Sequence, residues 1–303
     1  MIFRVFARFL FAVLLVPFGS AANAAEPLDT IPRTAVISAF MPEWTALLGM
    51  LQNRKEYVVN RTSFATGTIE GKPVVLFLSG ISMVNAAMTA QVGLDRFRID
   101  RIVFSGIAGG ADLGLKIGDV VVPEAWSEYL EAVFAREKNG TYLLPKFAER
   151  PVANYGMIFP QSVQIANGHQ EPEKRMWFPV DAQLLNIART VATTPLKVCT
   201  AENKCLTHKP RIIIGGHGVS GQAFVDNKTF REYVRTAFDA DVLDMESAAV
   251  AHVAYANKTP FIAFRSVSDL AGGGEGENEM GIFFQLASDN SATVVQAFLG
   301  AVP

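Results

Sequence analysis

Short runs of β-branched and apolar residues alternate with amphipathic stretches along most of this chain. The apolar runs predict strands at residues 34–40, 72–78, 101–105, 119–123, 211–215 and 261–266, and a shorter one at 241–244. After Ser82, Val84, Ala87, Met88 and Val92 recur at the spacing of one helical face. Similar patterns predict helices at 181–192, 227–238, 247–257 and 281–298. Strands alternating with helices predict an α/β protein, built as one domain.

One stretch, residues 127–180, departs from this alternation. It lacks clean periodicity and is interrupted by Pro145, Pro151, Pro160, Pro172 and Pro179. We therefore expect an insertion that lies on the core. Insertions of this kind often contribute walls to a binding pocket.

The N-terminus has the pattern of a signal peptide. Arg4 and Arg8 precede an apolar run at 9–16 that is too short to span a bilayer, and Ala22-Asn23-Ala24 offers a small-residue cleavage site. We expect a signal peptide at residues 1–24, a mature domain at 25–303, a secreted or periplasmic protein, and no membrane association after cleavage. An uncleaved membrane anchor is the alternative.

The remaining composition is that of an ordinary globular protein. Lys and Arg number 27 against 29 Asp and Glu, and half the residues are hydrophobic, so no basic surface predicts nucleic-acid binding. Cys199 and Cys205 favour a local disulfide in an oxidising compartment. Two unlinked thiols are the alternative, and a zinc site is a poorer one because His208 is the only nearby imidazole.

Several familiar motifs are incomplete. The cluster Gly106, Gly109 and Gly110 does not have the dinucleotide-binding spacing, and no phosphate-binding P-loop occurs. A serine-hydrolase elbow would need Gly where Gln222 stands. The four histidines are scattered, so the sequence predicts neither a metal site nor a cofactor.

Three carboxylates follow predicted strands: Glu43, Glu246 and Asp269. Ligands of α/β sheets bind beyond the carboxyl ends of the strands, so these side chains are candidates for one site. Each also has a simpler interpretation. Asp269 could begin a turn, Glu246 could favour a helix dipole, and Glu43 after Pro42 could open a helix.

Four separated blocks resemble the nucleoside phosphorylase and nucleosidase superfamily. They are residues 104–110 with 115–122, residues 219–225, residues 244–253 and residues 265–269. The resemblance is greatest to methylthioadenosine/S-adenosylhomocysteine nucleosidases and to exported plant bark and vegetative storage proteins. It implies a central mixed, twisted, partly barrel-like sheet flanked by helices, no cofactor, a purine nucleoside ligand and a homodimer or larger assembly.

The resemblance also implies a role for each matching residue. Asp269 would protonate purine N7 with Ser268 orienting it, Glu246 would bind the ribose hydroxyls, and Glu43 would deprotonate the attacking water. The base and sugar contacts correspond to Phe224, Val225, Met245, Ala108 and Gly109, and Arg265 would tune the water site or a carboxylate. Phe224 and Met245 could instead be core residues.

The nucleophile is predicted to be water, because no Arg lies between Ser38 and Leu48 to hold phosphate. We expect an exported nucleosidase acting on a 5′-modified adenosine. The alternatives are a phosphate-dependent purine nucleoside phosphorylase and a non-catalytic binding or storage protein. Ile107 replaces a Ser of the nucleosidases and Gln222 an acidic residue, and both changes bear on rate and substrate preference.

Overall fold

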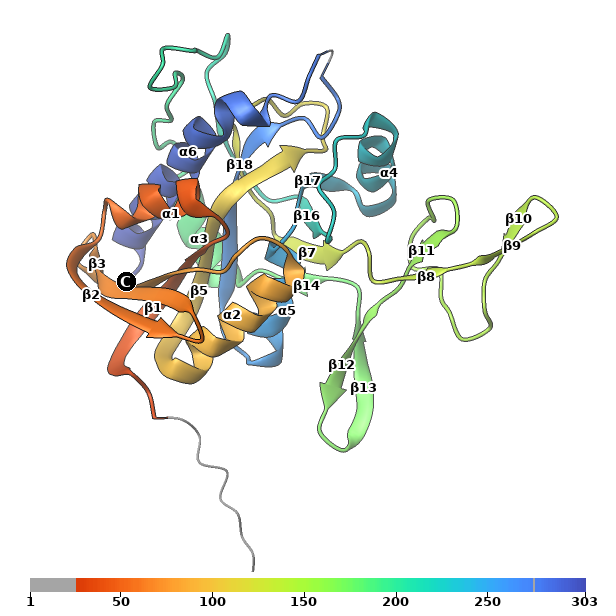
Figure 1. The fold of residues 1–303 in the computed structure, drawn as a ribbon, viewed down its shortest axis with the longest axis horizontal. Helices are drawn as coiled ribbons and strands as arrows, with labels where there is room; N and C mark the ends of the chain where they lie inside the picture. Colours follow the sequence, from red (N-terminus) through yellow and green to blue (C-terminus); the bar gives the residue numbers. More distant parts are fainter. Residues whose placement is uncertain (1–25, 275) are drawn as a thin grey trace, which may run out of the picture.

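The computed structural model describes residues 26–274 and 276–303 (Figure 1). The expected signal peptide lies outside the described residues. The helices of the described chain are α1 (Met41–Leu48), α2 (Met83–Arg96), α3 (Ala182–Thr190), α4 (Lys228–Phe238), α5 (Ser247–Ala256) and α6 (Met280–Ala301). Within these ranges, no helix combines the length and the apolar character needed to cross a membrane.

The large sheet is mixed, as expected, and is built around the long strand β5 (Phe97–Gly110). β5 pairs in parallel with β1 (Asp29–Ser38) and with β18 (Phe261–Asp269). On its other edge, β1 pairs in parallel with β4 (Lys72–Leu78). β4 pairs antiparallel with β3 (Thr62–Ile69), which pairs antiparallel with β2 (Gln52–Val59). Nearly every residue of β18 and the second half of β1 is buried, as expected for strands covered on both faces.

The remaining strands pair either with β18 or with the end of β5 and its neighbours. β18 pairs with β6 (Val120–Val122), which pairs with β15 (Ile212–Ile214). β16 (His217–Ser220) follows β15 after two glycines and lies between β7 (Ala125–Glu128) and β17 (Ala240–Asp244), and β17 returns to the end of β5. β14 (Phe178–Pro179) forms an edge next to β7. The partly barrel-like shape stays a prediction.

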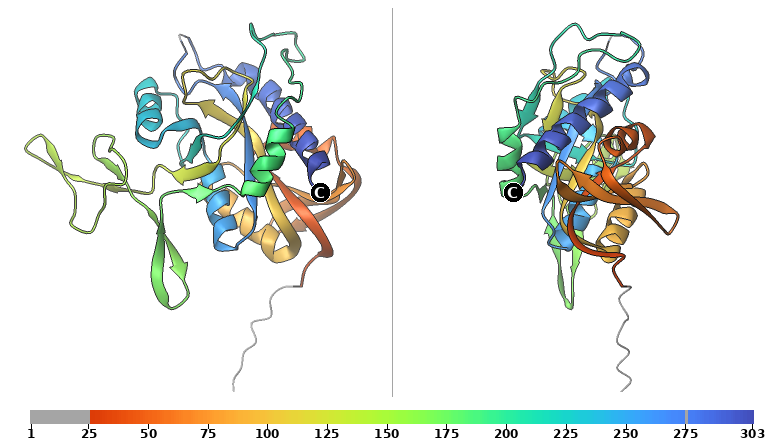
Figure 2. Two further views of the ribbon diagram at one scale, coloured as in Figure 1. Left: turned by 180° about the vertical axis from the view of Figure 1, so that it is seen from behind. Right: turned by 90° about the vertical axis from the view of Figure 1, so that its left-hand side faces the viewer.

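Helices cover both faces of this sheet. α2 packs with α5 on one face, whereas α3 and α6 pack on the other, and α1 lies against α6 (Figures 1 and 2). Side chains at the helix starts explain two boundaries: Asp181 accepts hydrogen bonds from Gln183 N and Leu184 N in α3, and Asn227 accepts one from Phe230 N in α4.

The apolar face predicted for α2 is not the buried one. Val84 and Met88 are 65% and 58% exposed, whereas the buried positions are the small residues Ala86, Thr89, Ala90 and Gly93. α2 packs closely against the sheet, and a Cβ on Gly93 would lie 2.9 Å from the Phe77 ring. The periodicity of apolar residues predicted the helix correctly but predicted the wrong buried face.

Between β7 and β14 the chain extends away from the body as a series of hairpins, so the insertion does not lie on the core as expected (Figures 1 and 2). It contains β8 (Ala132–Phe134), β9 (Arg136–Lys138), β10 (Thr141–Leu143), β11 (Ile158–Pro160), β12 (Val163–Asn167) and β13 (Gln170–Arg175). We call residues 131–175 the arm.

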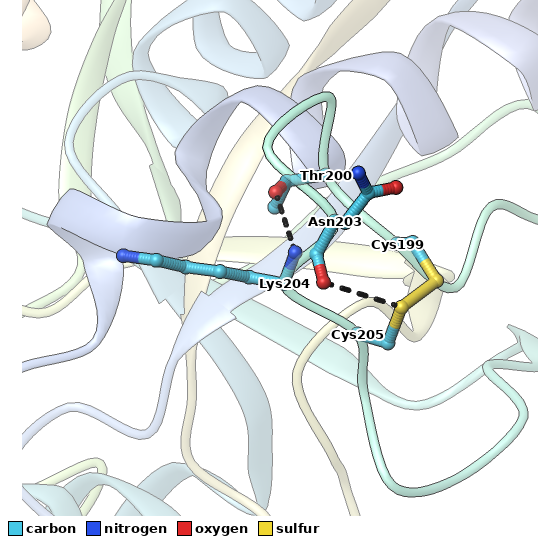
Figure 3. Close-up of a disulfide and its surroundings, with 5 residues drawn as sticks. All are labelled: Cys199, Thr200, Asn203, Lys204 and Cys205. Carbon is cyan, nitrogen blue, oxygen red and sulfur yellow. Dashed lines mark hydrogen bonds between the residues drawn. A yellow bond between two sulfur atoms is a disulfide. The ribbon is translucent and has the colours of Figure 1, made fainter.

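The disulfide between Cys199 and Cys205 is present, as preferred from the sequence (Figure 3). It closes a short polar loop in which Lys204 N donates to Thr200 Oγ1. The loop is additionally bonded through its backbone, because Thr200 N donates to the carbonyl of Lys204 at 2.9 Å.

Two predicted strands were too short. The predicted strand at 101–105 is extended at both ends in β5, and the one at 261–266 continues to Asp269 in β18. The glycines of residues 106–110 suggested a loop, but this segment pairs with β18 on one side and, at its end, with β17. Ala108, Gly109, Ser268 and Asp269 therefore lie within paired strands and not after them.

Candidate active site

A cavity of about 370 Å³ lies at the carboxyl ends of β1, β5, β17 and β18. Three carboxylates that are far apart in sequence, Glu43, Glu246 and Asp269, line it together. Its other lining residues are Ala39, Phe40, Ile81, Ile107, Ala108, Gly109, Ala223, Phe224, Val225, Leu243, Asp244, Met245, Ser268 and Met280. We call this cavity the pocket. No residue of the arm is among those described as lining it, so the arm supplies no wall here.

Glu43 lies in the first turn of α1 and is 2% exposed. Its Oε2 accepts hydrogen bonds from Ala39 N at 2.7 Å and Phe40 N at 3.3 Å, and its Oε1 accepts one from Ile107 N at 2.8 Å. Burial raises the pKa of Glu43 above its usual value, although Arg265 and these N–H groups oppose the rise. A fixed carboxyl with a raised pKa is suited to accepting a proton from water.

Glu246 precedes α5, at the end of β17, and is 5% exposed. Its Oε1 accepts a hydrogen bond from Ser82 N at 2.8 Å. Burial raises the pKa of Glu246 to about 8; Arg265 opposes this rise and neighbouring Asp244 adds to it. Burial thus works against the charged form of Glu246, whereas Arg265 and the Ser82 N–H favour it.

Asp269 ends β18 and is 3% exposed. Ser268 Oγ donates to its Oδ2 at 2.9 Å, and Ala271 N donates to its Oδ1 at 2.8 Å. Ser268 has a second acceptor in the carbonyl of Ala108, at 3.4 Å.

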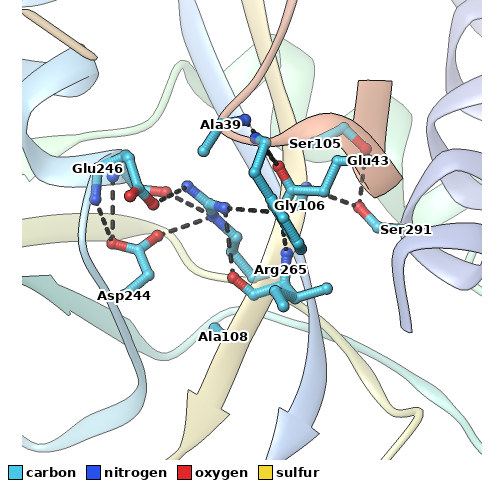
Figure 4. Close-up of polar contacts among 12 residues, drawn as sticks. Ala39, Glu43, Ser105, Gly106, Ala108, Asp244, Glu246, Arg265 and Ser291 are labelled. Atoms are coloured by element: carbon cyan, nitrogen blue, oxygen red, sulfur yellow. Dashed lines mark hydrogen bonds and ion pairs between the residues drawn. The ribbon is translucent and has the colours of Figure 1, made fainter. Parts of the chain in front are cut away.

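Arg265 does not line the pocket but lies buried behind it, between the carboxylates (Figure 4). Its Nε is 2.7 Å from Asp244 Oδ2, Nη2 is 3.6 Å from Glu246 Oε2, and Nη1 is 3.9 Å from Glu43 Oε1. Its guanidinium also lies over the Phe104 ring at 4.1 Å. One cation thus faces three buried carboxylates. A single positive charge does not offset the cost of burying all three negative charges, so burial still raises the pKa values of Glu43 and Glu246.

Gly106 allows this cluster to form. A Cβ at this position would lie 2.2 Å from Nη1 of Arg265 and 2.5 Å from Oε1 of Glu43. On the α6 side, Ser291 Oγ accepts a hydrogen bond from Gly106 N at 3.1 Å (Figure 4). The glycine-rich sequence of β5 therefore serves close packing and not a flexible loop.

Sequence reasoning missed two polar residues of this site. Asp244 lines the pocket, accepts hydrogen bonds from Ser220 Oγ, Glu246 N and Ser247 N, and pairs with Arg265. Asn278 donates to Asp269 Oδ1 at 3.4 Å and to Asp226 Oδ1 at 3.0 Å. Asp244 could have been predicted from the sequence, because it is an acidic residue two positions before Glu246. No local sequence pattern indicated Asn278.

Comparisons with known proteins identify the family of this chain. Residues 33–300 match the family profile described as the phosphorylase superfamily. The chain is 29% identical over 268 residues to a 5′-methylthioadenosine/S-adenosylhomocysteine nucleosidase of Listeria monocytogenes serotype 4b, covering 88% of this chain and 98% of that protein. It is 27% identical over 254 residues to bark storage protein A of Populus deltoides, covering 79% and 78% of the two chains.

A solved structure has the same fold. The nucleosidase of the same type from Neisseria meningitidis, in complex with methylthio-immucillin-A, superposes with a TM-score of 0.68. It is 27% identical in sequence, with 90% of this chain and 100% of that chain covered. Since the family profile matches most of the chain, the expected resemblance is confirmed: this protein belongs to the phosphorylase superfamily.

Proposed function

We propose that this protein is a nucleosidase that hydrolyses the N-glycosidic bond of adenosine-type nucleosides. The observation that carries the proposal is the meeting of Glu43, Glu246 and Asp269 in one pocket, from three separate parts of the chain. Cleaving this bond builds positive charge on the sugar and negative charge on the purine, so acidic and basic groups are needed on both sides of the bond.

Each carboxylate has a role in the proposed reaction. Glu43 takes a proton from water as the water oxygen bonds to the anomeric carbon. The bond from that carbon to purine N9 breaks, its electron pair passes into the purine, and Asp269 donates a proton to N7. Glu246 accepts hydrogen bonds from the ribose hydroxyls and stabilises the positive charge on the sugar. The products are the free base and the free sugar.

The rest of the pocket supports a 5′-modified adenosine as substrate. Phe224 is 55% exposed and can stack on a base, with Val225 next to it. Phe40, Ile81 and Met280 supply apolar surface suited to a 5′-alkylthio group. The nucleosidase relatives are named for methylthioadenosine and S-adenosylhomocysteine, which are of this type.

The charges of the site favour water over phosphate as the nucleophile. Among the described residues that line the pocket there is no Lys or Arg, and Arg265 behind it is already paired with carboxylates. A phosphate dianion would meet Glu43 and Glu246 without a free cation to hold it. Phosphorolysis is therefore not favoured.

Turnover assays test the proposal. Purified protein is incubated with methylthioadenosine, adenosine and inosine, with and without phosphate. We expect free base without phosphate, and fastest with methylthioadenosine. Strict phosphate dependence would indicate a phosphorylase, and nucleoside binding without turnover would indicate a binding or storage protein.

The acid is tested by Asp269→Asn, which should abolish turnover while leaving nucleoside affinity within a few-fold. Asp239→Asn is the matched control, because Asp239 is an exposed carboxylate at the end of α4. Unchanged turnover in Asp269→Asn would contradict the assigned acid.

We further propose that the protein is exported and forms a homodimer or larger assembly. Export is supported by the signal-peptide pattern of residues 1–24 and by the bond between Cys199 and Cys205. Assembly is supported by large apolar side chains that are exposed on the arm and on α2, among them Phe134, Phe147, Val84 and Met88.

A further inference from the structure

The loop between β4 and α2 has an unusual backbone at the residue that contacts Glu246. Ser82 has φ 82° and ψ 159°, a combination that residues other than glycine rarely adopt. Its N–H donates to Glu246 Oε1 at 2.8 Å. The neighbouring Ile81 lines the pocket. The unusual conformation thus occurs where the loop meets a carboxylate of the proposed site.

The loop is anchored on both sides of Ser82. Ser79 N donates to the carbonyl of Ser38 at 2.8 Å, and Thr89 Oγ1 donates to the carbonyl of Ser79 at 3.1 Å. Ala86 N donates to the carbonyl of Ser82 at 3.0 Å, which ties the residue to the first turn of α2. Strained backbone persists only where its surroundings hold it in this way.

Helix capping does not explain the conformation. Ser82 is the N-cap residue of α2, but its side chain makes no capping hydrogen bond. An N-cap residue ordinarily has an extended backbone with negative φ, as Asp181 does before α3. The conformation of Ser82 therefore needs another explanation. The hydrogen bond from its N–H to Glu246 Oε1 provides one.

We propose that Ser82 is a positioning residue for Glu246, whose left-handed backbone aims its N–H at Oε1 and so fixes the carboxylate to receive the ribose hydroxyls. The proposal rests on the proposed nucleosidase function, in which Glu246 binds those hydroxyls. With Ser82 N on Oε1 and Arg265 Nη2 3.6 Å from Oε2, both oxygens are restrained before the substrate arrives.

The same arrangement occurs at Asp269. Ala271 is buried, has φ 50°, and its N–H donates to Asp269 Oδ1 at 2.8 Å. By contrast, Arg61 and Glu70 have positive φ in the turns that join β2 to β3 and β3 to β4, where tight hairpins require it. Two carboxylates of the pocket are therefore each held by an N–H from a non-glycine residue with positive φ.

Three substitutions at Ser82 separate the backbone from the side chain. Ser82→Gly can keep the conformation without strain, Ser82→Ala removes only the hydroxyl, and Ser82→Val carries a β-branched side chain that disfavours positive φ. We expect the Gly and Ala variants to retain the KM for methylthioadenosine, with Gly melting at higher temperature. In Ser82→Val the N–H leaves Glu246, and we expect KM to rise about tenfold or more with a smaller change in kcat.

The pH dependence gives a second readout. The Ser82 N–H lowers the pKa of Glu246, so its loss should raise that pKa further. The acid limb of kcat/KM should then move to higher pH in Ser82→Val alone. The titration of Glu246 in the unliganded protein, followed by NMR of ¹³C-labelled Glu carboxyls and assigned with Glu246→Gln, should move in the same direction.

The matched control is Arg61→Val, which places a β-branched side chain at φ 68° far from the pocket. It should lose stability but leave KM and the Glu246 titration unchanged. The proposal is overturned if Ser82→Val leaves KM and the Glu246 titration unchanged. It is also overturned if Ser82→Ala or Ser82→Gly shifts either quantity. If Ser82→Val fails to fold, Ser82→Thr, which is also β-branched but keeps the hydroxyl, takes its place with the same expected rise in KM. If the wild type cleaves no nucleoside, the proposed function fails, and the NMR titration still tests the contact.

Discussion

Single residues decide the electrostatics of this pocket, and Glu246 is the clearest case. Its pKa is about 8 in the folded protein against an ordinary value of 4.5. The folded state therefore binds the proton more tightly than the unfolded state. The resulting stability is full below pH 4.5 and is lost as the pH rises through 8.

We predict from this that Glu246→Gln flattens the decline in unfolding free energy between pH 4.5 and 8. The amide is neutral throughout and has no proton to lose. Urea unfolding of wild type and variant across this range measures the difference, with the exposed Glu137→Gln as control. Parallel curves for wild type and Glu246→Gln would show that the raised pKa is wrong.

Gly106 gives a prediction about packing. In Gly106→Ala the new methyl group would overlap Arg265 Nη1 and Glu43 Oε1, so one of these groups must move. We expect a loss of about 1–3 kcal/mol in stability and a marked fall in kcat. Gly300→Ala is the control, because a Cβ there would meet no atom closer than 3.6 Å. Wild-type kcat in Gly106→Ala would argue against a fixed Glu43.

At the scale of elements, α6 begins beside the proposed acid. Asn278 Oδ1 accepts a hydrogen bond from Met280 N at the start of α6, while its Nδ2 donates to Asp269 and Asp226. A single side chain therefore joins the start of this helix, the wall residue Met280 and the proposed acid.

We expect Asn278→Asp to preserve the contact with α6 but to place a third carboxylate beside Asp226 and Asp269. The melting temperature should change little, whereas kcat/KM should fall about tenfold or more. Asp269 becomes an anion as it donates its proton, and the variant replaces the hydrogen bond to that anion, worth about 1.5–3 kcal/mol, by a like charge. Asn278→Ser, which retains an acceptor for Met280 N, is the matched comparison. Equal kcat/KM in Asn278→Asp and wild type would show that Asn278 does not influence the reaction.

The elements also show what the sequence could and could not predict. Strands with continuous apolar runs, such as β4 and the start of β18, were found because burial on both faces leaves a plain pattern. β2 was missed because it is polar and largely exposed, so its register comes from pairing with β3 and not from its own composition. The glycines of β5 looked like a loop because a single sequence does not reveal close neighbours.

The same distinction holds for the site. Glu43 and Glu246 were candidates because they follow predicted strands, and Asp269, which is the last residue of β18, because its block resembles the family motif. Arg265 was found, but its position between three carboxylates depends on tertiary packing. Ser82 and Asn278 contact the site from loops, where no periodicity indicates which way a residue faces.

At the scale of the whole molecule, export makes a testable prediction. The mature protein should begin at Ala25, should be recovered outside the cytoplasm, and should contain no free thiol because Cys199 and Cys205 are bonded. N-terminal sequencing, cell fractionation and thiol titration of the protein from its native host measure these three properties. A cytoplasmic protein that retains residues 1–24 would contradict export.

Assembly is tested by light scattering coupled to size exclusion. We expect a mass of two chains or more, and a shift toward one chain when exposed apolar residues of the arm and α2 are made acidic, as in Phe147→Asp with Val84→Asp. Glu137→Gln should leave the mass unchanged. A wild-type protein with the mass of one chain at micromolar concentration would contradict the proposed assembly.

The central claim is that three acidic side chains surround one sugar, and a crystal structure of Asp269→Asn soaked with methylthioadenosine tests it most directly. We predict ribose hydroxyls within hydrogen-bond distance of Glu246, purine N7 beside residue 269, and a water between Glu43 and the anomeric carbon. A nucleoside bound elsewhere, or bound here with its ribose away from Glu246 and Glu43, would contradict the account.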